Sequence, residues 1–150
     1  ENLIFLGKMY GLERPKESAL MVLEDVGLAP RRNDRVRTFS RGMLQRLSIA
    51  RAILHDPSIL FLDEPFTGLD IHASNVLKEH LQSLHNKKRT ILMTTHDVSC
   101  GLEMCDKVAL QVMGRFAFFK DVKEFSKESF ETMYFDAVRD NQFTMGIRNR

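Results

Sequence analysis

Two adjacent carboxylates, Asp63 and Glu64, directly follow a run of four apolar residues, 59–62. Such a run predicts a strand that is buried on both faces. In open α/β sheets, ligands bind beyond the carboxyl ends of the strands, so these acids stand where chemistry takes place. Asp63 is placed to hold Mg²⁺ through oxygen contacts, and Glu64 is placed to polarise a water for attack on a phosphate. The alternative is a strand that ends in a solvated acidic turn, and this short motif alone does not separate the two.

A second candidate site is the start of a helix at Ser40. Ser40 is predicted to cap a helix whose apolar face continues to Leu54 and which stops before Pro57. A helix start leaves unpaired N–H groups and the positive end of a dipole, and Gly42 would let a phosphate approach the backbone closely. A capped amphipathic helix without a ligand explains the same residues, and for this stretch alone it is the favoured interpretation.

Two further polar segments could contribute to a site. One lies a few residues after the first predicted strand, and the other lies at the end of a second predicted strand. Gly68 permits a tight turn, and Asp70 is predicted to cap the helix that comes next. A second apolar strand at 90–94 ends in a polar trio that contains His96. A histidine there could hydrogen-bond a phosphate or an attacking water. The competing interpretation is that His96 caps the short helix predicted at 98–105.

The bulk composition restricts the class of protein. The chain of 150 residues is long enough for one domain with a core, and its net charge of +2 is too small to argue for a nucleic-acid or membrane partner. Cys100 and Cys105 would lie about 140° apart around a helix, so buried thiols are expected rather than a disulfide or a metal pair. The remaining histidines lack metal-ligand spacing and are predicted at the surface or at helix ends: His55, His72, His80 and His85.

The spacing of apolar residues predicts the other elements. They are helices at 1–12, 15–27, 40–54 and about 71–86, a β-hairpin at 107–119 that turns at Gly114, and a last helix around Phe130 and Tyr134. No apolar run approaches the length of about 20 residues that crosses a bilayer. The residues after Asp140 are predicted to fray.

Taken in order, these motifs resemble the second half of an ABC-type ATPase domain, over about residues 1–120. Residues 39–52 are similar to the family's signature helix, 59–64 to its Walker B strand with the catalytic glutamate, 68–70 to its D-loop, and 94–97 to the segment with its switch histidine. The resemblance implies an α/β fold, with a P-loop NTPase-like parallel sheet and part of the ABC helical subdomain. It divides the chain into that subdomain (about 1–56), the second half of the catalytic core (about 57–120) and a C-terminal helical tail (about 121–150).

The resemblance also implies a reaction. The complete domain would bind ATP and Mg²⁺ and hydrolyse the ATP, which would power a membrane transporter. Asp63 would organise the Mg²⁺, Glu64 would activate the attacking water, and His96 would contact the γ-phosphate.

The same resemblance implies partners. Ser40, Arg41 and Gly42 would bind the ATP held by a second ATPase subunit, with a homodimer expected, and Asp70 would couple the two ATP sites. The other implied partner is a membrane permease, which places the protein at the cytoplasmic face of the cell membrane. No nucleic-acid partner is expected.

Two departures from the family pattern change what is expected of this chain. Arg41 and Met43 stand where the family usually has glycine and glutamine, and this form is similar to that of haem-exporter or cytochrome c maturation ATPases. The phosphate-binding motif G-x-x-x-x-G-K-[ST] does not occur. The first half of the core is therefore expected upstream, and these 150 residues alone are expected to be inactive.

Two alternative classes stay open. ATPases of the SMC type, which maintain DNA, also separate the two halves of the site, but they place a long coiled coil before the signature. Residues 1–38 are instead broken by Gly11, Pro15, Gly27 and Pro30 and carry no sustained heptads. The other alternative is an inactive truncated fragment.

Overall fold

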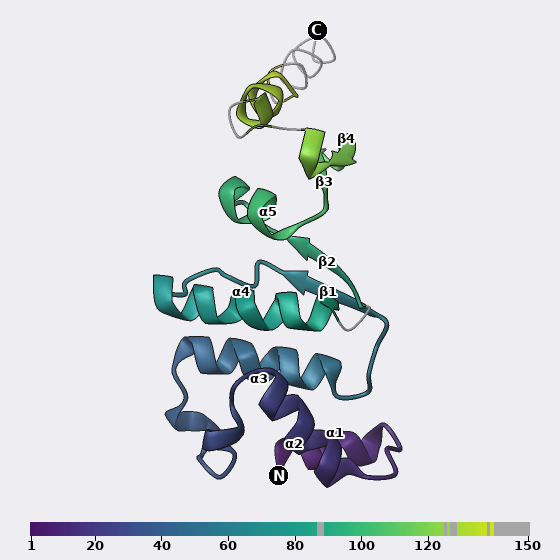
Figure 1. The fold of residues 1–150 in the computed structure, drawn as a ribbon, viewed down its shortest axis with the longest axis vertical. Coiled ribbons are helices and arrows are strands. Elements are labelled where there is room, and N and C mark those ends of the chain that lie inside the picture. Colours follow the sequence, from purple (N-terminus) through teal and green to yellow (C-terminus); the bar gives the residue numbers. More distant parts are fainter. Residues whose placement is uncertain (87–88, 125, 127–128, 138, 140–150) are drawn as a thin grey trace, which may run out of the picture. The chain divides into compact units, whose positions relative to one another are not determined.

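The chain divides into two compact units, Glu1–His96 and Asp97–Arg150 (Figure 1). The computed structural model describes residues 1–86, 89–124, 126, 129–137 and 139. Among these residues, the first unit combines helices with a parallel pair of strands, and the second combines helices with an antiparallel hairpin.

Helices make up most of the first unit. They are α1 (Asn2–Met9), α2 (Pro15–Asp25), α3 (Arg41–Ile53) and α4 (Ile71–Asn86), with 3₁₀ turns at Ala29–Arg31 and Val36–Thr38. The strands β1 (Ile59–Asp63) and β2 (Thr90–Thr94) pair in parallel, with Asp63 opposite Thr94. In Figure 1, α3 and α4 run side by side, and the two strands lie on the opposite side of α4 from α3.

The helices before the signature stretch are short. α1 has 8 residues and α2 has 11, which argues against the long coiled coil of SMC-type ATPases. None of the helices formed by the described residues has both the length and the apolar character that a bilayer crossing requires.

Capping residues fix where these helices begin and end. Pro15 lies in the first turn of α2, where a backbone N–H would have no partner within the helix, so that the lack of one in proline costs no hydrogen bond. Gly27, with φ of 65°, follows the end of that helix in the left-handed conformation. At the start of α3, the Ser40 Oγ accepts from the Met43 N–H at 3.3 Å. These three positions confirm the predicted helix ends.

The core of the first unit lies where α2, α3 and α4 meet. Its most deeply buried aliphatic side chains come from these helices and the segments beside them: Val26, Leu28, Ile53, Leu77, Leu81 and Leu84. On β1, Leu60 is 3% exposed whereas Phe61 is 72% exposed. The prediction that this strand is buried on both faces is therefore wrong for the described chain, because only one face of the strand pair is covered.

His80 departs from its predicted place at the surface or at a helix end. It lies within α4 and is half-buried, and a side chain at Gly27 would meet its Nε2 atom at 2.8 Å. Arg46 of α3 reaches the same place and donates from Nη1 to the Val26 carbonyl at 3.2 Å. Burial lowers the pKa of the His80 imidazole, and the Arg46 charge lowers it further, against opposing effects of nearby acids. His80 thus packs where three helices meet, in surroundings that disfavour its charged form.

The second unit is built on an antiparallel hairpin. Its elements are α5 (Val98–Met104), β3 (Lys107–Val112), β4 (Arg115–Asp121) and a 3₁₀ turn at Val122–Glu124. The hairpin turns at Met113 and Gly114, whose φ values are 51° and 77°, and this confirms the turn predicted there. Residues 129–137 are helical, and Phe130 meets Phe118 of β4 edge to face, with ring centroids 5.7 Å apart. The fraying predicted after Asp140 lies outside the described residues.

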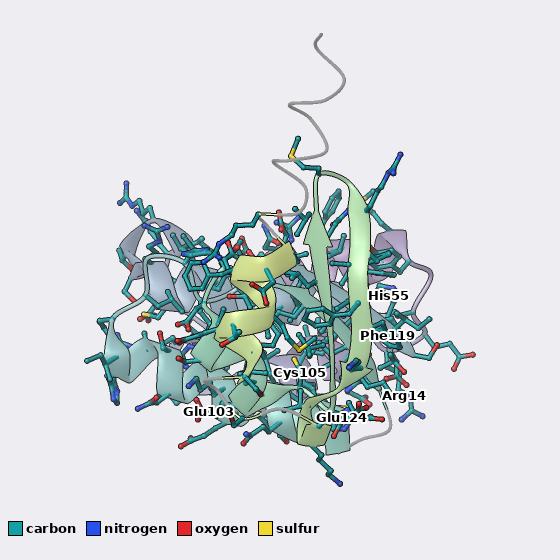
Figure 2. The ribbon with its side chains drawn as sticks, turned by 90° about the horizontal axis from the view of Figure 1, so that it is seen from above. Arg14, His55, Glu103, Cys105, Phe119 and Glu124 are labelled. Carbon is teal, nitrogen blue, oxygen red and sulfur yellow. The ribbon has the colours of Figure 1, made fainter. Side chains whose placement is uncertain are left out.

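Neither cysteine forms a disulfide; Cys100 is buried and Cys105 is partly buried. Figure 2 shows Cys105 and Glu124 at the end of the hairpin opposite its turn, where the Val122 N–H donates to the Asp106 carbonyl at 2.9 Å. Burial raises the pKa of the Cys105 thiol, and the Asp106 charge raises it further. The thiol is therefore a poor nucleophile at neutral pH.

Candidate active site

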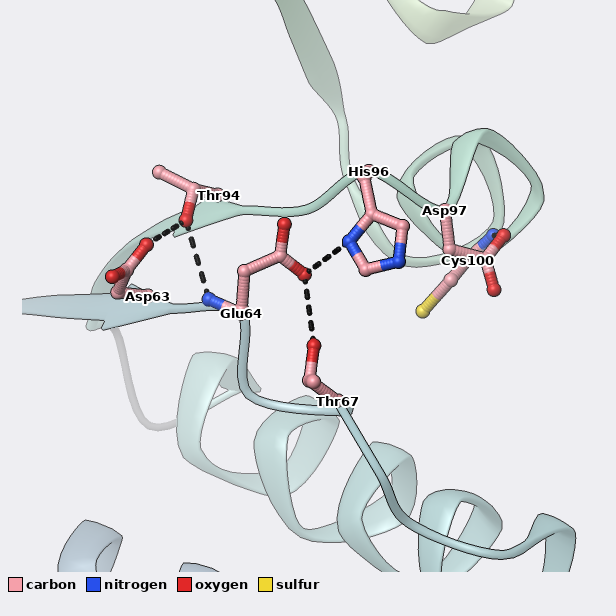
Figure 3. Close-up of polar contacts among 7 residues, drawn as sticks. All are labelled: Asp63, Glu64, Thr67, Thr94, His96, Asp97 and Cys100. Atoms are coloured by element: carbon pink, nitrogen blue, oxygen red, sulfur yellow. Dashed lines mark hydrogen bonds and ion pairs between the residues drawn. The ribbon is translucent and has the colours of Figure 1, made fainter.

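The carboxyl ends of β1 and β2 bring three of the predicted residues together (Figure 3). Because the strands are parallel and Asp63 pairs with Thr94, the residues that follow each strand leave the sheet at the same edge. The Glu64 N–H donates to the Thr94 carbonyl at 3.1 Å and to the Thr94 Oγ1 at 3.2 Å. The Thr94 hydroxyl in turn donates to the Asp63 Oδ1.

Glu64 is the centre of this cluster. Its Oε2 lies 2.9 Å from the His96 Nδ1 and accepts from the Thr67 hydroxyl at 3.2 Å (Figure 3). The Glu64 side chain is 35% exposed, so the carboxylate is fixed by protein donors and still open to water. Its backbone has φ of 46°, a left-handed conformation that non-glycine residues rarely adopt and that is often found at functional sites.

His96 was open to two interpretations, as a site residue or as a helix cap. The cap of α5 is Asp97, whose Oδ1 accepts from the Cys100 N–H at 3.0 Å. His96 instead faces Glu64 from the end of β2, with Nδ1 as the nitrogen that faces the carboxylate. An imidazole N–H that donates to a carboxylate makes a charge-assisted hydrogen bond, which orients both side chains.

Asp63 fits one mode of magnesium binding. Mg²⁺ in phosphate-binding sites is commonly held by one or two carboxylates, with substrate phosphates and water completing the shell. Among the described residues, no group of three or more histidine, cysteine, aspartate or glutamate side chains could hold a metal by itself. The Asp63 carboxylate offers hard oxygen donors of the kind that Mg²⁺ prefers, and a cation held there would need further ligands, such as the phosphates of a nucleotide.

Gly42 lies in a close contact between α3 and α4. It is buried near the start of α3, where an added Cβ would lie 3.0 Å from the Cβ of Ala73 and 3.9 Å from a methyl of Leu69. Glycine at this position lets α3 approach α4 closely. The sequence alone indicated only the approach of a phosphate.

The remaining predicted residues gather at the starts of α3 and α4. Asp70 caps α4, because its Oδ1 accepts from the Ala73 N–H at 2.7 Å. Arg41 lies against Gly68, since its guanidinium carbon is 2.2 Å from where a Cβ on Gly68 would stand. Gly68 also has φ of 70°, and this left-handed backbone is what requires glycine in the turn, since the end of the flexible Arg41 side chain could move aside. The stretch 64–70 joins this second cluster to Glu64.

Two threonines of the site were not singled out from the sequence. The sequence predicts Thr94 as the last residue of a strand and the first of the segment 94–97, and Thr67 in the turn before Gly68, with no role for either hydroxyl. The two apolar runs do not fix the register of the strands, so the pairing of Thr94 with Asp63 came only from the structure. That pairing places the Thr94 hydroxyl beside Asp63.

Part of this chain matches a known family. Residues 2–67 match the model of the family described as ABC transporter. The chain is 42% identical over 114 residues to the ABC transporter ATP-binding protein NatA of Bacillus subtilis (strain 168), which covers 73% of this chain and 46% of NatA. Residues 2–67 thus carry part of an ABC transporter ATP-binding domain.

A second relative and a solved structure agree with this assignment. The Nod factor export ATP-binding protein I of Rhizobium etli is 39% identical over 117 residues, which cover 77% of this chain and 37% of that protein. MJ1267, an ATP-binding cassette of an ABC transporter, has the same fold with a TM-score of 0.72 at 21% identity, over 85% of this chain and 49% of that chain. The predicted α/β fold of a partial ABC ATPase domain is thus confirmed.

The matches cover only part of each relative. This ABC ATPase segment spans less than half the length of NatA and of the Nod factor protein. Neither name refers to haem or cytochrome c, so the expected likeness to haem exporters gains no support from them.

Proposed function

We propose that the complete protein is the ATP-hydrolysing subunit of an ABC transporter, and that this chain supplies the hydrolytic side of its ATP site. The observation that carries the proposal is the meeting of Asp63, Glu64 and His96 at the adjoining ends of β1 and β2, with Glu64 Oε2 2.9 Å from His96 Nδ1. Similarity to ABC transporter ATP-binding proteins supports the substrate, ATP.

In this proposal Glu64 is the general base. A water beside the Glu64 carboxylate would lose a proton to it while the water oxygen attacks the γ-phosphate, and the bond between that phosphorus and ADP would break. His96 and the Thr67 hydroxyl would hold the carboxylate in place, and the His96 ring would also face the transferred phosphate. Mg²⁺, held by Asp63, would supply positive charge to the β- and γ-phosphates.

Ser40, Arg41 and Gly42 would act on the ATP of a second, identical subunit. The Ser40 Oγ accepts from the Met43 N–H, so its own proton remains a donor for a phosphate oxygen. The dipole and N–H groups at the start of α3 would add to that attraction. Asp70 would couple the two sites, since it fixes the start of α4 beside the turn that Arg41 contacts.

The transport step is proposed from the relatives. A membrane permease would be the partner, and the ATPase would work at the cytoplasmic face of the cell membrane. Export is the favoured direction, because one relative is named for Nod factor export. Haem is one candidate substrate, because the Arg41–Gly42–Met43 form of the signature is similar to that of haem-exporter ATPases, and a test of haem transport by the complete transporter would decide it.

The experiment is ATP hydrolysis by the purified full-length protein with and without Glu64→Gln. We expect the variant to bind ATP and to lose steady-state turnover by a factor of about 10² to 10⁴, as general-base removal commonly does. The matched control is Glu13→Gln, an exposed glutamate in the link between α1 and α2, which should leave turnover unchanged. Turnover by Glu64→Gln at the wild-type rate would refute the proposed role.

A further inference from the structure

Thr94 connects the two carboxylates of the site through one hydroxyl. Its Oγ1 donates to the Asp63 Oδ1 and accepts from the Glu64 N–H at 3.2 Å (Figure 3). A hydroxyl has a single proton, so its donation to Asp63 leaves its lone pairs for the Glu64 N–H. The hydroxyl can therefore make both hydrogen bonds at once, as the donor to Asp63 and as the acceptor from the Glu64 N–H.

The register of the strands makes this bridge specific to position 94. Thr94 is the last residue of β2 and pairs with Asp63, the last residue of β1. The Glu64 N–H is shared between the carbonyl and the hydroxyl of Thr94, at 3.1 and 3.2 Å. That N–H belongs to the residue with the left-handed backbone, whose φ is 46°. The same side chain thus orients the Asp63 carboxylate and supports the backbone that aims Glu64.

We propose that Thr94 is a positioning residue for the metal-binding carboxylate and for the general base. The inference rests on the proposed ATPase function. The Thr94 hydroxyl fixes the rotation of the Asp63 carboxylate, so that the carboxylate is ready for a divalent cation bound with ATP. Partners of this kind orient metal ligands in many sites, and their removal typically weakens metal binding or activity by about 10- to 100-fold.

A single substitution separates the positioning role of the Thr94 hydroxyl from the contribution of the Thr94 side chain to the strand. Thr94→Val keeps the shape and the β-branch of the side chain, so the strand is preserved, but it removes the hydroxyl. Thr94→Ser keeps the hydroxyl and loses one methyl. Thr90→Val is the control, because Thr90 lies on the same face at the other end of β2, opposite Ile59.

The test uses the full-length protein with Glu64→Gln, so that binding is measured without turnover. Mn²⁺ binding in the presence of saturating ATP is followed by electron paramagnetic resonance for each Thr variant, and ATP binding without metal is followed by fluorescence. We expect Thr94→Val to weaken Mn²⁺ binding by about 10-fold, as loss of a ligand's partner does. Metal-free ATP binding and the melting temperature should stay close to those of the parent, and Thr94→Ser and Thr90→Val should bind Mn²⁺ as the parent does.

Several outcomes would overturn the inference. Mn²⁺ affinity unchanged in Thr94→Val, or weakened equally in Thr90→Val, would mean that the hydroxyl does not position the metal ligand. A failure of Thr94→Ser to restore binding would mean that shape is what matters. ATP hydrolysis by the otherwise wild-type protein is measured in parallel. No ATP hydrolysis by the wild-type protein would refute the proposed function. Normal hydrolysis by the wild type together with unchanged Mn²⁺ affinity in Thr94→Val would refute only the role of Thr94.

Discussion

Gly42→Ala should force α3 and α4 apart, and Ala73→Gly should relieve that strain. The added methyl would lie 3.0 Å from the Ala73 Cβ, whereas non-bonded carbon atoms pack best at about 3.5–4.0 Å. Overpacking of this kind costs about 1–3 kcal/mol, and the better helix propensity of alanine returns at most about 1 kcal/mol. We therefore expect Gly42→Ala to lower the free energy of unfolding by about 0–2 kcal/mol.

The Ala73→Gly protein tests whether the contact between α3 and α4 causes the destabilisation by Gly42→Ala. With Ala73→Gly in place, the methyl of residue 42 has room, and only the propensity gain of up to about 1 kcal/mol remains. The same substitution should then be neutral or stabilising. The measurement is urea unfolding of the four full-length proteins without nucleotide, with the midpoint and slope fitted for each. An effect of Gly42→Ala that agrees within about 0.5 kcal/mol in both backgrounds would refute the packing argument.

Two further predictions concern stability. The pKa of His80 is lowered in the folded state by burial and by Arg46, so its contribution to stability is fully present above the ordinary value of 6.5 and is lost as the pH falls below it. His80→Gln should therefore flatten the loss of stability that occurs as the pH falls below about 6.5, measured by urea unfolding, and an unchanged acid slope would contradict the assigned cause. The second concerns residues 1–150 without the rest of the protein: Ile59, Phe61 and Leu92 are 53%, 72% and 58% exposed on the strand pair, so this fragment should aggregate and bind Mg-ATP weakly. Micromolar ATP affinity in calorimetry, with cooperative unfolding of a monomer, would show that the rest of the protein is dispensable.

Local signals in the sequence predicted the helix ends well. Ser40 and Asp70 cap α3 and α4 because a cap depends on a side chain and the N–H three residues later. Gly114 marked its turn for the same local reason. The order of the apolar runs and polar ends also predicted that Asp63, Glu64 and His96 follow the carboxyl ends of two strands, which parallel strands place at one edge of a sheet. The contact between Glu64 and His96 came only from the structure.

Features that depend on neighbours distant in sequence were not predicted. The exposure of Phe61 depends on what covers the face of the strand pair, and an apolar run cannot report that. The burial of His80 depends on how α2, α3 and α4 converge. The role of Gly42 in packing required knowledge that Ala73 faces it.

The central claim is that Glu64 and His96 act as one unit in ATP hydrolysis, and a double-mutant cycle on turnover tests it most directly. The four full-length proteins are the wild type, Glu64→Gln, His96→Ala and the double variant, each assayed at saturating Mg-ATP. When two groups act as a unit, removal of one costs about as much turnover as removal of both. We expect each single variant to lose turnover strongly and the double variant to be no slower than the slower single variant. Losses that multiply in the double variant would show that the two residues act independently, which would contradict the 2.9 Å pair as the working unit of the site.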